Sequence, residues 1–240
     1  MGLNYFVLDS ERVRDDLSLS SLDELAKRAD ESSGPRVVIT VPVRRSDFPE
    51  RLEGTMRILS RRDRASICLV AGNPAYLTEE ERSRSAPRLL SLAAGRVLRE
   101  LGKRIDVFVG TERVEGTVER LCKELDVVPF LLLDLHPPEL LERFRPNGNR
   151  LAVYVPFALG PLSEALPALL PYVKRRMMVR HLTGDPSDHV ERFCVVGDPE
   201  RVASRLRSLT ERYDVIVGYP ALLDPAQLRF WALVNHATGF

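Results

Sequence analysis

The sequence predicts a parallel (β/α)8 barrel, regular or slightly degenerate, that forms a single domain over residues 1–240. Eight short apolar runs of the length of buried strands recur along the chain. Segments with apolar residues at helical spacing alternate with those runs, as expected for parallel βα units. The chain length of 240 residues is close to the roughly 250 that one such barrel needs. An open, doubly wound parallel sheet is the alternative.

Each expected strand is a short run rich in apolar and β-branched residues. Several runs, such as VVITV within 37–43, are continuously apolar. Continuous runs are typical of parallel strands that are covered on both faces. The eight expected strands are Tyr5–Leu8, Val37–Val43, Ser66–Val70, Ile105–Val109, Val127–Leu133, Leu151–Phe157, Phe193–Val196 and Val215–Val217.

Amphipathic helices are expected between these strands. Their apolar stripes lie within 22–29, 48–59, 90–101, 114–125 and 202–213. A stripe of this width covers one face of a sheet. Proline removes a backbone donor from a helix interior and clashes with the preceding turn. We therefore expect Pro167 and Pro171 to break the helix after the sixth strand into short pieces.

Charge and composition exclude several classes of protein. The chain has 35 basic and 34 acidic residues, which argues against a nucleic-acid binder. It has no apolar run near the ~18 residues of a membrane span, and its start lacks a signal-peptide pattern. The cysteines Cys68, Cys122 and Cys194 are far apart, so neither a disulfide framework nor a metal site is expected. We expect a cytoplasmic protein with no membrane or nucleic-acid partner.

Common catalytic motifs are missing from the chain. It contains no GxGxxG, GxxxxGK[ST], GxSxG or HExxH pattern, so dinucleotide, P-loop, serine-hydrolase and zincin sites have no support. A Schiff-base barrel needs a lysine near a strand end. The four lysines, Lys27, Lys103, Lys123 and Lys174, do not directly follow any expected strand.

In such barrels the active site is built from the loops at the C-terminal ends of the strands. Residues that follow the expected strands are therefore the candidate ligand-binding groups, and only barrel closure would bring them to one mouth. The candidates for ligand binding are Arg44, Asn73, Gly110, Thr111, Gly197, Gly218 and Tyr219.

The segment DLHPPE (134–139) places a carboxylate and an imidazole two residues apart after the fifth strand. Asp134 and His136 are the candidate catalytic residues, with His136 handling a proton. The alternative is a carboxylate that caps the next helix with a histidine beside it. A further polar segment, HLTGDPSDHVE (181–191), fits turn chemistry better than a metal site.

The segment VVGDPERVASRL (195–206) predicts a well-capped helix, with Asp198 as the N-cap and Pro199 at the first helical position. It also allows a phosphate site, because helix N-termini attract anions and Gly197 permits close backbone approach. The carboxylates of Asp198 and Glu200 oppose that second interpretation. Both interpretations stay open.

The pattern FCVVGDPERVASRLRSLTERYDVIVGYP (193–220) resembles the C-terminal end of the bacterial-luciferase-like superfamily. Segment 68–101 is similar to the strand end and following helix of that family. The residues that carry the C-terminal resemblance are Gly197, Pro199, Glu200, Val202, Arg205 and Leu206.

This resemblance implies a barrel that binds FMN or the deazaflavin coenzyme F420, often as a homodimer, and oxidises or reduces a small-molecule substrate. The glycine ends at Gly197 and Gly218 would then approach the cofactor phosphate. Asp9-Ser10 stands where many members have Asp-His. That departure favours an alternative, a non-catalytic barrel of the same fold that binds a ligand or a protein partner.

Overall fold

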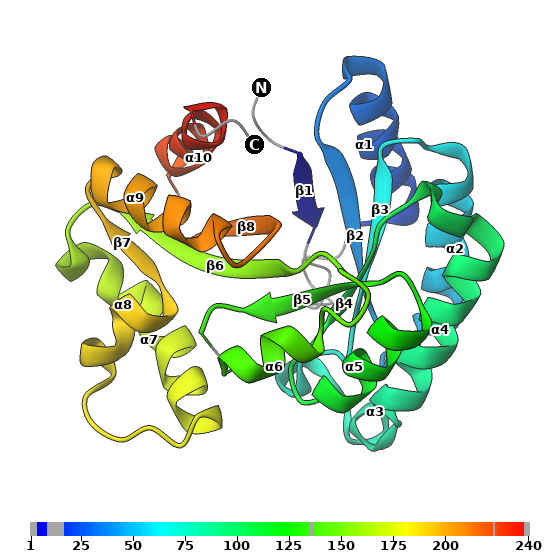
Figure 1. Cartoon of the computed structure of the whole chain (residues 1–240). Coiled ribbons are helices and arrows are strands. Elements are labelled where there is room, and N and C mark those ends of the chain that lie inside the picture. The colour runs from blue at the N-terminus through cyan, green and yellow to red at the C-terminus, as the bar shows by residue number, and fades with distance from the viewer. Residues whose placement is uncertain (1–3, 9–16, 135–136, 223, 238–240) are drawn as a thin grey trace. The chain divides into compact units, whose positions relative to one another are not determined.

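The computed structural model describes residues 4–8, 17–134, 137–222 and 224–237 (Figure 1). Contacts divide the chain into two compact units. The N-terminal unit contains Asn4–Phe130 and Arg143–Asn149, and the C-terminal unit contains the described residues of Leu131–Glu142 and Arg150–Phe240. The single-domain organisation expected for 1–240 stays a prediction.

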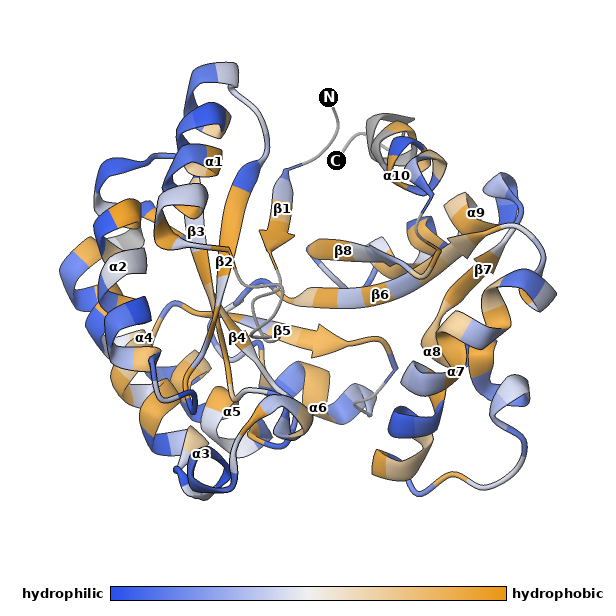
Figure 2. Ribbon diagram, turned by 180° about the vertical axis from the view of Figure 1, so that it is seen from behind, coloured by the Kyte–Doolittle hydropathy of each residue, from blue (hydrophilic) through white to orange (hydrophobic). Residues whose placement is uncertain are grey.

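The N-terminal unit is built on parallel strands that pair in sequence order. Its strands are β1 (Tyr5–Leu8), β2 (Arg36–Pro42), β3 (Ala65–Val70), β4 (Val107–Gly110) and the first residues of β5 (Val128–Leu132). Residues 37–42 of β2 are all buried, because the run is apolar on both faces. Figure 2 shows β2, β3 and β4 largely in the colour of hydrophobic residues, whereas α1 and α2 carry polar residues as well.

Helices alternate with these strands. They are α1 (Leu19–Ser32), α2 (Phe48–Arg61), α3 (Glu79–Ser83), α4 (Ala86–Leu101) and α5 (Glu115–Glu124), with short 3-10 turns η2 (Pro74–Tyr76) and η3 (Gly102–Arg104). The apolar stripe of α4 is buried at Leu90, Ala93 and Val97, as its spacing predicts.

The C-terminal unit centres on β6 (Ala152–Leu159), which pairs in parallel with both β7 (Val195–Gly197) and β8 (Val215–Pro220). Its helices are α6 (Pro138–Arg143), α7 (Leu162–Val179), α8 (Val190–Phe193), α9 (Pro199–Thr210) and α10 (Pro225–Ala237), with the 3-10 turn η4 (Pro186–His189). A regular barrel places each strand beside the next in sequence. Here β7 has three residues, and the six residues of β8 pair instead with the longer β6.

All eight expected strands are present, each starting within two residues of its expected position, and helices separate them. The parallel α/β barrel class predicted from the sequence is therefore confirmed.

The prediction for the helix after the sixth strand was wrong. α7 runs unbroken for 18 residues with Pro167 and Pro171 inside it. Both prolines are exposed, one turn apart on the same face, so the carbonyls that lose a partner lie on the solvent side. The opposite face carries Ala165, Leu169 and Val173, all fully buried.

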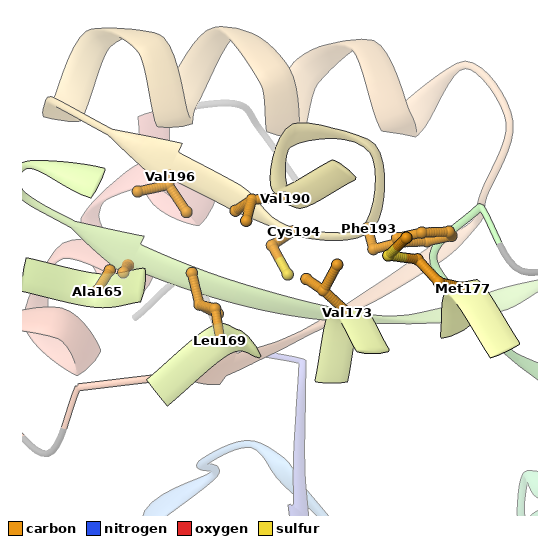
Figure 3. Packing of buried hydrophobic residues seen from close by; sticks show 9 residues of the cluster. Ala165, Leu169, Val173, Met177, Val190, Phe193, Cys194 and Val196 are labelled. Atoms are coloured by element: carbon orange, nitrogen blue, oxygen red, sulfur yellow. The ribbon is translucent and has the colours of Figure 1, made fainter. Parts of the chain in front are cut away.

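This buried face of α7 forms a hydrophobic cluster with α8 and β7 (Figure 3). Leu169 and Val173 point toward Val190, Phe193 and neighbouring side chains in that view. Burying a side chain of this size contributes about 1.5–3 kcal/mol, which offsets the cost of the prolines. The cluster holds α7 against α8 and β7.

α10 is attached to the C-terminal end of β6 by the buried side chain of Gln227. Its Oε1 accepts the Leu159 N–H at 2.7 Å, and its Nε2 donates to the Leu159 carbonyl at 3.2 Å. The amide thus replaces a strand partner at the point where β6 ends. None of the described helices is long and apolar enough to cross a membrane.

Candidate functional site

An open cavity of about 410 Å³ lies at the carboxyl ends of β6 and β7. It is called the C-terminal cavity below. One side is formed by the residues after β6, and the other by the end of β7, the start of α9 and α8. The lining residues are Gly160, Pro161, Leu162, Glu191, Val196, Gly197, Asp198 and Arg201.

Two glycines allow the chain to turn at this edge. Leu159 and Gly197 are register partners in the parallel pair, and Gly160 N–H donates to the Gly197 carbonyl at 3.0 Å. The φ angles of Gly160 and Gly197 are +120° and +146°. Side-chain-bearing residues rarely adopt such angles, so glycine lets both strands lead directly into helices. The two helices begin beside the cavity as a result.

The two helix starts differ in how they are capped. The carboxylate of Asp198 accepts the Arg201 N–H at 2.9 Å, which confirms the well-capped helix expected for 195–206. Pro161 precedes α7 and makes no side-chain cap, and Glu164 lies in the first turn. Acidic side chains therefore lie at both helix starts, Asp198 and Glu200 at α9 and Glu164 at α7, and they oppose anion binding at the helix termini themselves.

Arg201 is the cationic side chain that lines the C-terminal cavity. Its stem lies across Gly197, and its Nη2 lies 2.5 Å from Glu191 Oε1. The side chains of Arg201 and Glu191 are 58% and 66% exposed. The ion pair therefore faces solvent, where such pairs contribute about 0–1 kcal/mol.

Of the candidate residues in the C-terminal unit, Gly197 lines the cavity and Asp134 does not. Asp134 has a φ of +49°, and its Oδ2 lies 2.5 Å from Arg192 Nε. The Asp134 carboxylate therefore forms an ion pair with Arg192, whereas the sequence also allowed it to cap the following helix. His136 lies outside the described residues.

Gly218 and Tyr219 pack against aromatic side chains. A Cβ on Gly218 would lie 2.4 Å from ring atoms of Trp231, so the glycine leaves room for that ring. Tyr219 lies between Tyr154 and Tyr172, with ring centroids 5.5 Å and 5.7 Å away. Burial raises the pKa of the Tyr154 hydroxyl. The structure thus gives both candidates a packing role.

The candidates Arg44 and Asn73 make contacts within the N-terminal unit. Arg44 Nε and Nη2 donate to the carbonyls of Ala71 and Gly72 at 2.8 Å and 2.7 Å, joining the loops after β2 and β3. The Asn73 side chain accepts the Ala75 N–H at 3.1 Å and caps η2.

Thr111 and Gly110 also contact neighbours in the same unit. The buried Thr111 donates its N–H and its hydroxyl to the Phe130 carbonyl, both at 3.2 Å. A Cβ on Gly110 would lie 3.1 Å from Val70 Cγ1. The convergence of six strand ends at one mouth stays a prediction.

Sequence reasoning missed Glu81, a buried carboxylate near the ends of β2 and β3. It accepts the Ser46 N–H at 2.6 Å and the Thr78 N–H at 2.9 Å. These hydrogen bonds lower the pKa of Glu81 to about 2. The capping-box pattern from Thr78 to Glu81 is the signal that could have found it.

Within the polar segment 181–191, residues 186–189 form η4 and α8 begins at Val190. Asp185 accepts the N–H and hydroxyl of Ser187 at 2.8 Å and 2.7 Å, and His189 Nε2 lies 3.2 Å from the Thr183 carbonyl. Within the part of the chain that the structure describes, no three His, Cys, Asp or Glu side chains are grouped to hold a metal ion.

A solved structure shares the fold of this chain. The oxygenating constituent of 3,6-diketocamphane monooxygenase from the CAM plasmid of Pseudomonas putida, a type II Baeyer-Villiger monooxygenase in complex with FMN, matches with a TM-score of 0.55 and 13% identity. The match covers 96% of this chain and 86% of that one, and it shows the fold alone. The aldolase QR15 matches with a TM-score of 0.42 and 12% identity over 91% and 89% of the two chains.

Sequence comparison gives a relative and a family. The uncharacterised protein MJ1239 of Methanocaldococcus jannaschii is 28% identical over 228 residues, which are 94% of this chain and 84% of that protein. A family model described as a family of unknown function (DUF7388) matches residues 1–226, and the chain therefore belongs to that family.

Proposed function

We propose that this chain is a flavin- or deazaflavin-dependent oxidoreductase of the bacterial-luciferase-like superfamily that binds the phosphate of its cofactor at the C-terminal cavity. The observation that carries the proposal is the position of this cavity, at the carboxyl ends of parallel strands. Ligands of α/β barrels bind at that edge. A structure of the same fold holds FMN, and segment 193–220 resembles the same superfamily.

The cavity fits a phosphate-bearing cofactor in size and partly in charge. Its volume of about 410 Å³ lies within the roughly 300–1,000 Å³ of small-molecule sites. Gly197 leaves room for the stem of Arg201, and Arg201 supplies a guanidinium that suits phosphate. The carboxylates of Asp198 and Glu191 line the same cavity, but Asp198 already caps α9 and Glu191 is paired with Arg201.

Different residues would bind the cofactor and transfer the proton. A bound flavin or deazaflavin supplies hydride transfer, and the barrel loops orient it against substrate. Arg201, whose stem lies over Gly197, would hold the phosphate. Asp134 and His136 stay the candidates for proton transfer, and Arg192 would orient the Asp134 carboxylate. A small-molecule substrate, a homodimer and a cytoplasmic location also belong to this proposal.

Cofactor titration tests this function. The purified chain is titrated with FMN, with coenzyme F420 and with riboflavin, which lacks the phosphate, while cofactor absorbance and fluorescence are followed. We expect FMN or F420 to bind, and riboflavin to bind more weakly than FMN by about tenfold or more, since charge-assisted hydrogen bonds contribute about 1.5–3 kcal/mol. Failure of both FMN and F420 to bind would overturn the proposal.

The second candidate function is a barrel of the same fold that binds a ligand or protein partner without catalysis. Two observations favour it. The guanidinium of Arg44 holds backbone carbonyls, and Gly218 makes room for Trp231, so both have roles in the fold that need no cofactor. This alternative predicts that the chain shows no turnover with either cofactor.

A further inference from the structure

We infer that Glu191 is an internal counter-ion of the C-terminal cavity, which Arg201 releases when it binds the phosphate monoester of a ligand. The ligand class rests on the proposed function, whereas the exchange of partners rests on the geometry of the Glu191–Arg201 pair. Glu191 would then set the affinity of the cavity for anions. Arg201 would be the residue that recognises them.

The first step is the position of Arg201. A Cβ on Gly197 would lie 2.8 Å from Arg201 Cδ and 3.3 Å from its Cβ and Cγ. The stem of Arg201 therefore lies across the end of β7, over Gly197, which has no side chain. This path brings the guanidinium to the cavity wall and to Glu191 on α8.

The second step is the low cost of separating the pair. Arg201 and Glu191 are ten residues apart in sequence, and both side chains are more than half exposed. Because an exposed pair contributes little to stability, a doubly charged phosphate can replace the single carboxylate at Arg201. The Asp198 carboxylate accepts the Arg201 backbone N–H and can stay in place during this exchange.

The neighbouring ion pair of Arg192 and Asp134 differs from the Glu191–Arg201 pair in its exposure and position. Arg192 and Asp134 are 37% and 38% exposed, and Asp134 adopts a left-handed backbone conformation at this contact. Neither residue lines the cavity. That pair joins the end of β5 to α8, whereas the Glu191–Arg201 pair faces the open space in which a ligand can compete.

The test is titration of the full chain and its variants with inorganic phosphate, FMN and riboflavin, by calorimetry and flavin fluorescence. Removing the competitor in Glu191→Gln is expected to raise the affinity for phosphate and FMN about two- to fivefold, the effect of removing an exposed ion pair. Riboflavin affinity is expected to stay the same. Arg201→Ala is expected to lower phosphate and FMN affinity about tenfold or more, and Arg201→Lys less.

The matched control is Glu24→Gln, which removes a similarly exposed ion pair, with Arg28, on α1 of the N-terminal unit. It is expected to bind as the natural chain does. Equal affinity of the natural chain and Glu191→Gln for phosphate and FMN overturns the inference, even where FMN binding supports the proposed function. Phosphate binding that follows Arg201 and Glu191 supports the inference. It does so even where FMN and coenzyme F420 both fail to bind, an outcome that refutes the proposed function. Absence of phosphate and FMN binding overturns the inference, whereas the proposed function is overturned only when coenzyme F420 also fails to bind.

Discussion

Arg201 lies over Gly197, with Arg201 Cδ only 2.8 Å from the place that a Cβ on Gly197 would take. Gly197 also has a φ of +146°. One glycine therefore meets two requirements, a backbone turn out of β7 and a path for the side chain that lines the C-terminal cavity. The resemblance of segment 193–220 to a known family includes this glycine, and the structure supplies a physical reason for it.

Gly197→Ala is predicted to lose both stability and ligand binding. The alanine strains the backbone and displaces the Arg201 stem, which we expect to cost about 1–3 kcal/mol of unfolding free energy. Urea denaturation measures the loss, and phosphate titration measures the displaced guanidinium. Gly95→Ala in α4 is the control, because a Cβ there meets nothing within 4 Å. That control is expected to gain about 0.5–1 kcal/mol. Equal stability of Gly197→Ala and the natural chain would contradict the prediction.

Gly218→Ala is predicted to disrupt the packing between β8 and α10. The added Cβ would lie 2.4 Å from the ring of Trp231, which itself packs on Phe157 with ring centroids 4.6 Å apart. Overpacking of this kind costs about 1–3 kcal/mol. Trp231 is the single tryptophan of the chain, so its fluorescence reports the change directly. An unchanged emission spectrum together with unchanged urea unfolding would refute the packing role.

Local patterns predicted the strands well because each buried strand is itself an apolar run, as in residues 37–42 of β2. Contacts between residues that are distant in sequence could not be predicted from these patterns. Arg44 donates to carbonyls 27 and 28 residues away, and Gly218 makes room for a ring on α10. The pairing of β8 with β6 likewise joins segments that are distant in sequence. Of the candidate site residues, Gly197 was placed at a cavity because its motif is local.

The continuous α7 shows that packing outweighs local propensity. Pro171→Ala is predicted to stabilise the chain by about 1–2 kcal/mol. Proline in a helix interior costs about 3 kcal/mol relative to alanine. Part of that cost is offset because proline also lowers the conformational entropy of the unfolded chain. The residue is exposed, so the change removes no buried contact. Thermal and urea unfolding measure the gain in unfolding free energy. A loss of stability in Pro171→Ala would show that packing of the proline ring stabilises α7.

Glu81 is predicted to make the stability of the chain depend on acid pH. Hydrogen bonds from the backbone N–H groups of Thr78 and Ser46 lower its pKa from 4.5 to about 2. The unfolded chain therefore binds the proton first, so the stabilisation is complete above pH 4.5 and is lost as the pH falls toward 2. At neutral pH, Glu81→Gln is expected to cost about 1–3 kcal/mol, because it weakens charge-assisted hydrogen bonds to a buried group. The difference in unfolding free energy between the natural chain and Glu81→Gln, measured by urea denaturation from pH 7 downward, should stay constant to about pH 5 and then shrink.

Glu80→Gln, on the same helix and with its side chain 83% exposed, should show no such pH-dependent difference. A difference for Glu81→Gln that does not change with pH would show that the carboxylate is held by its shape and not by its charge.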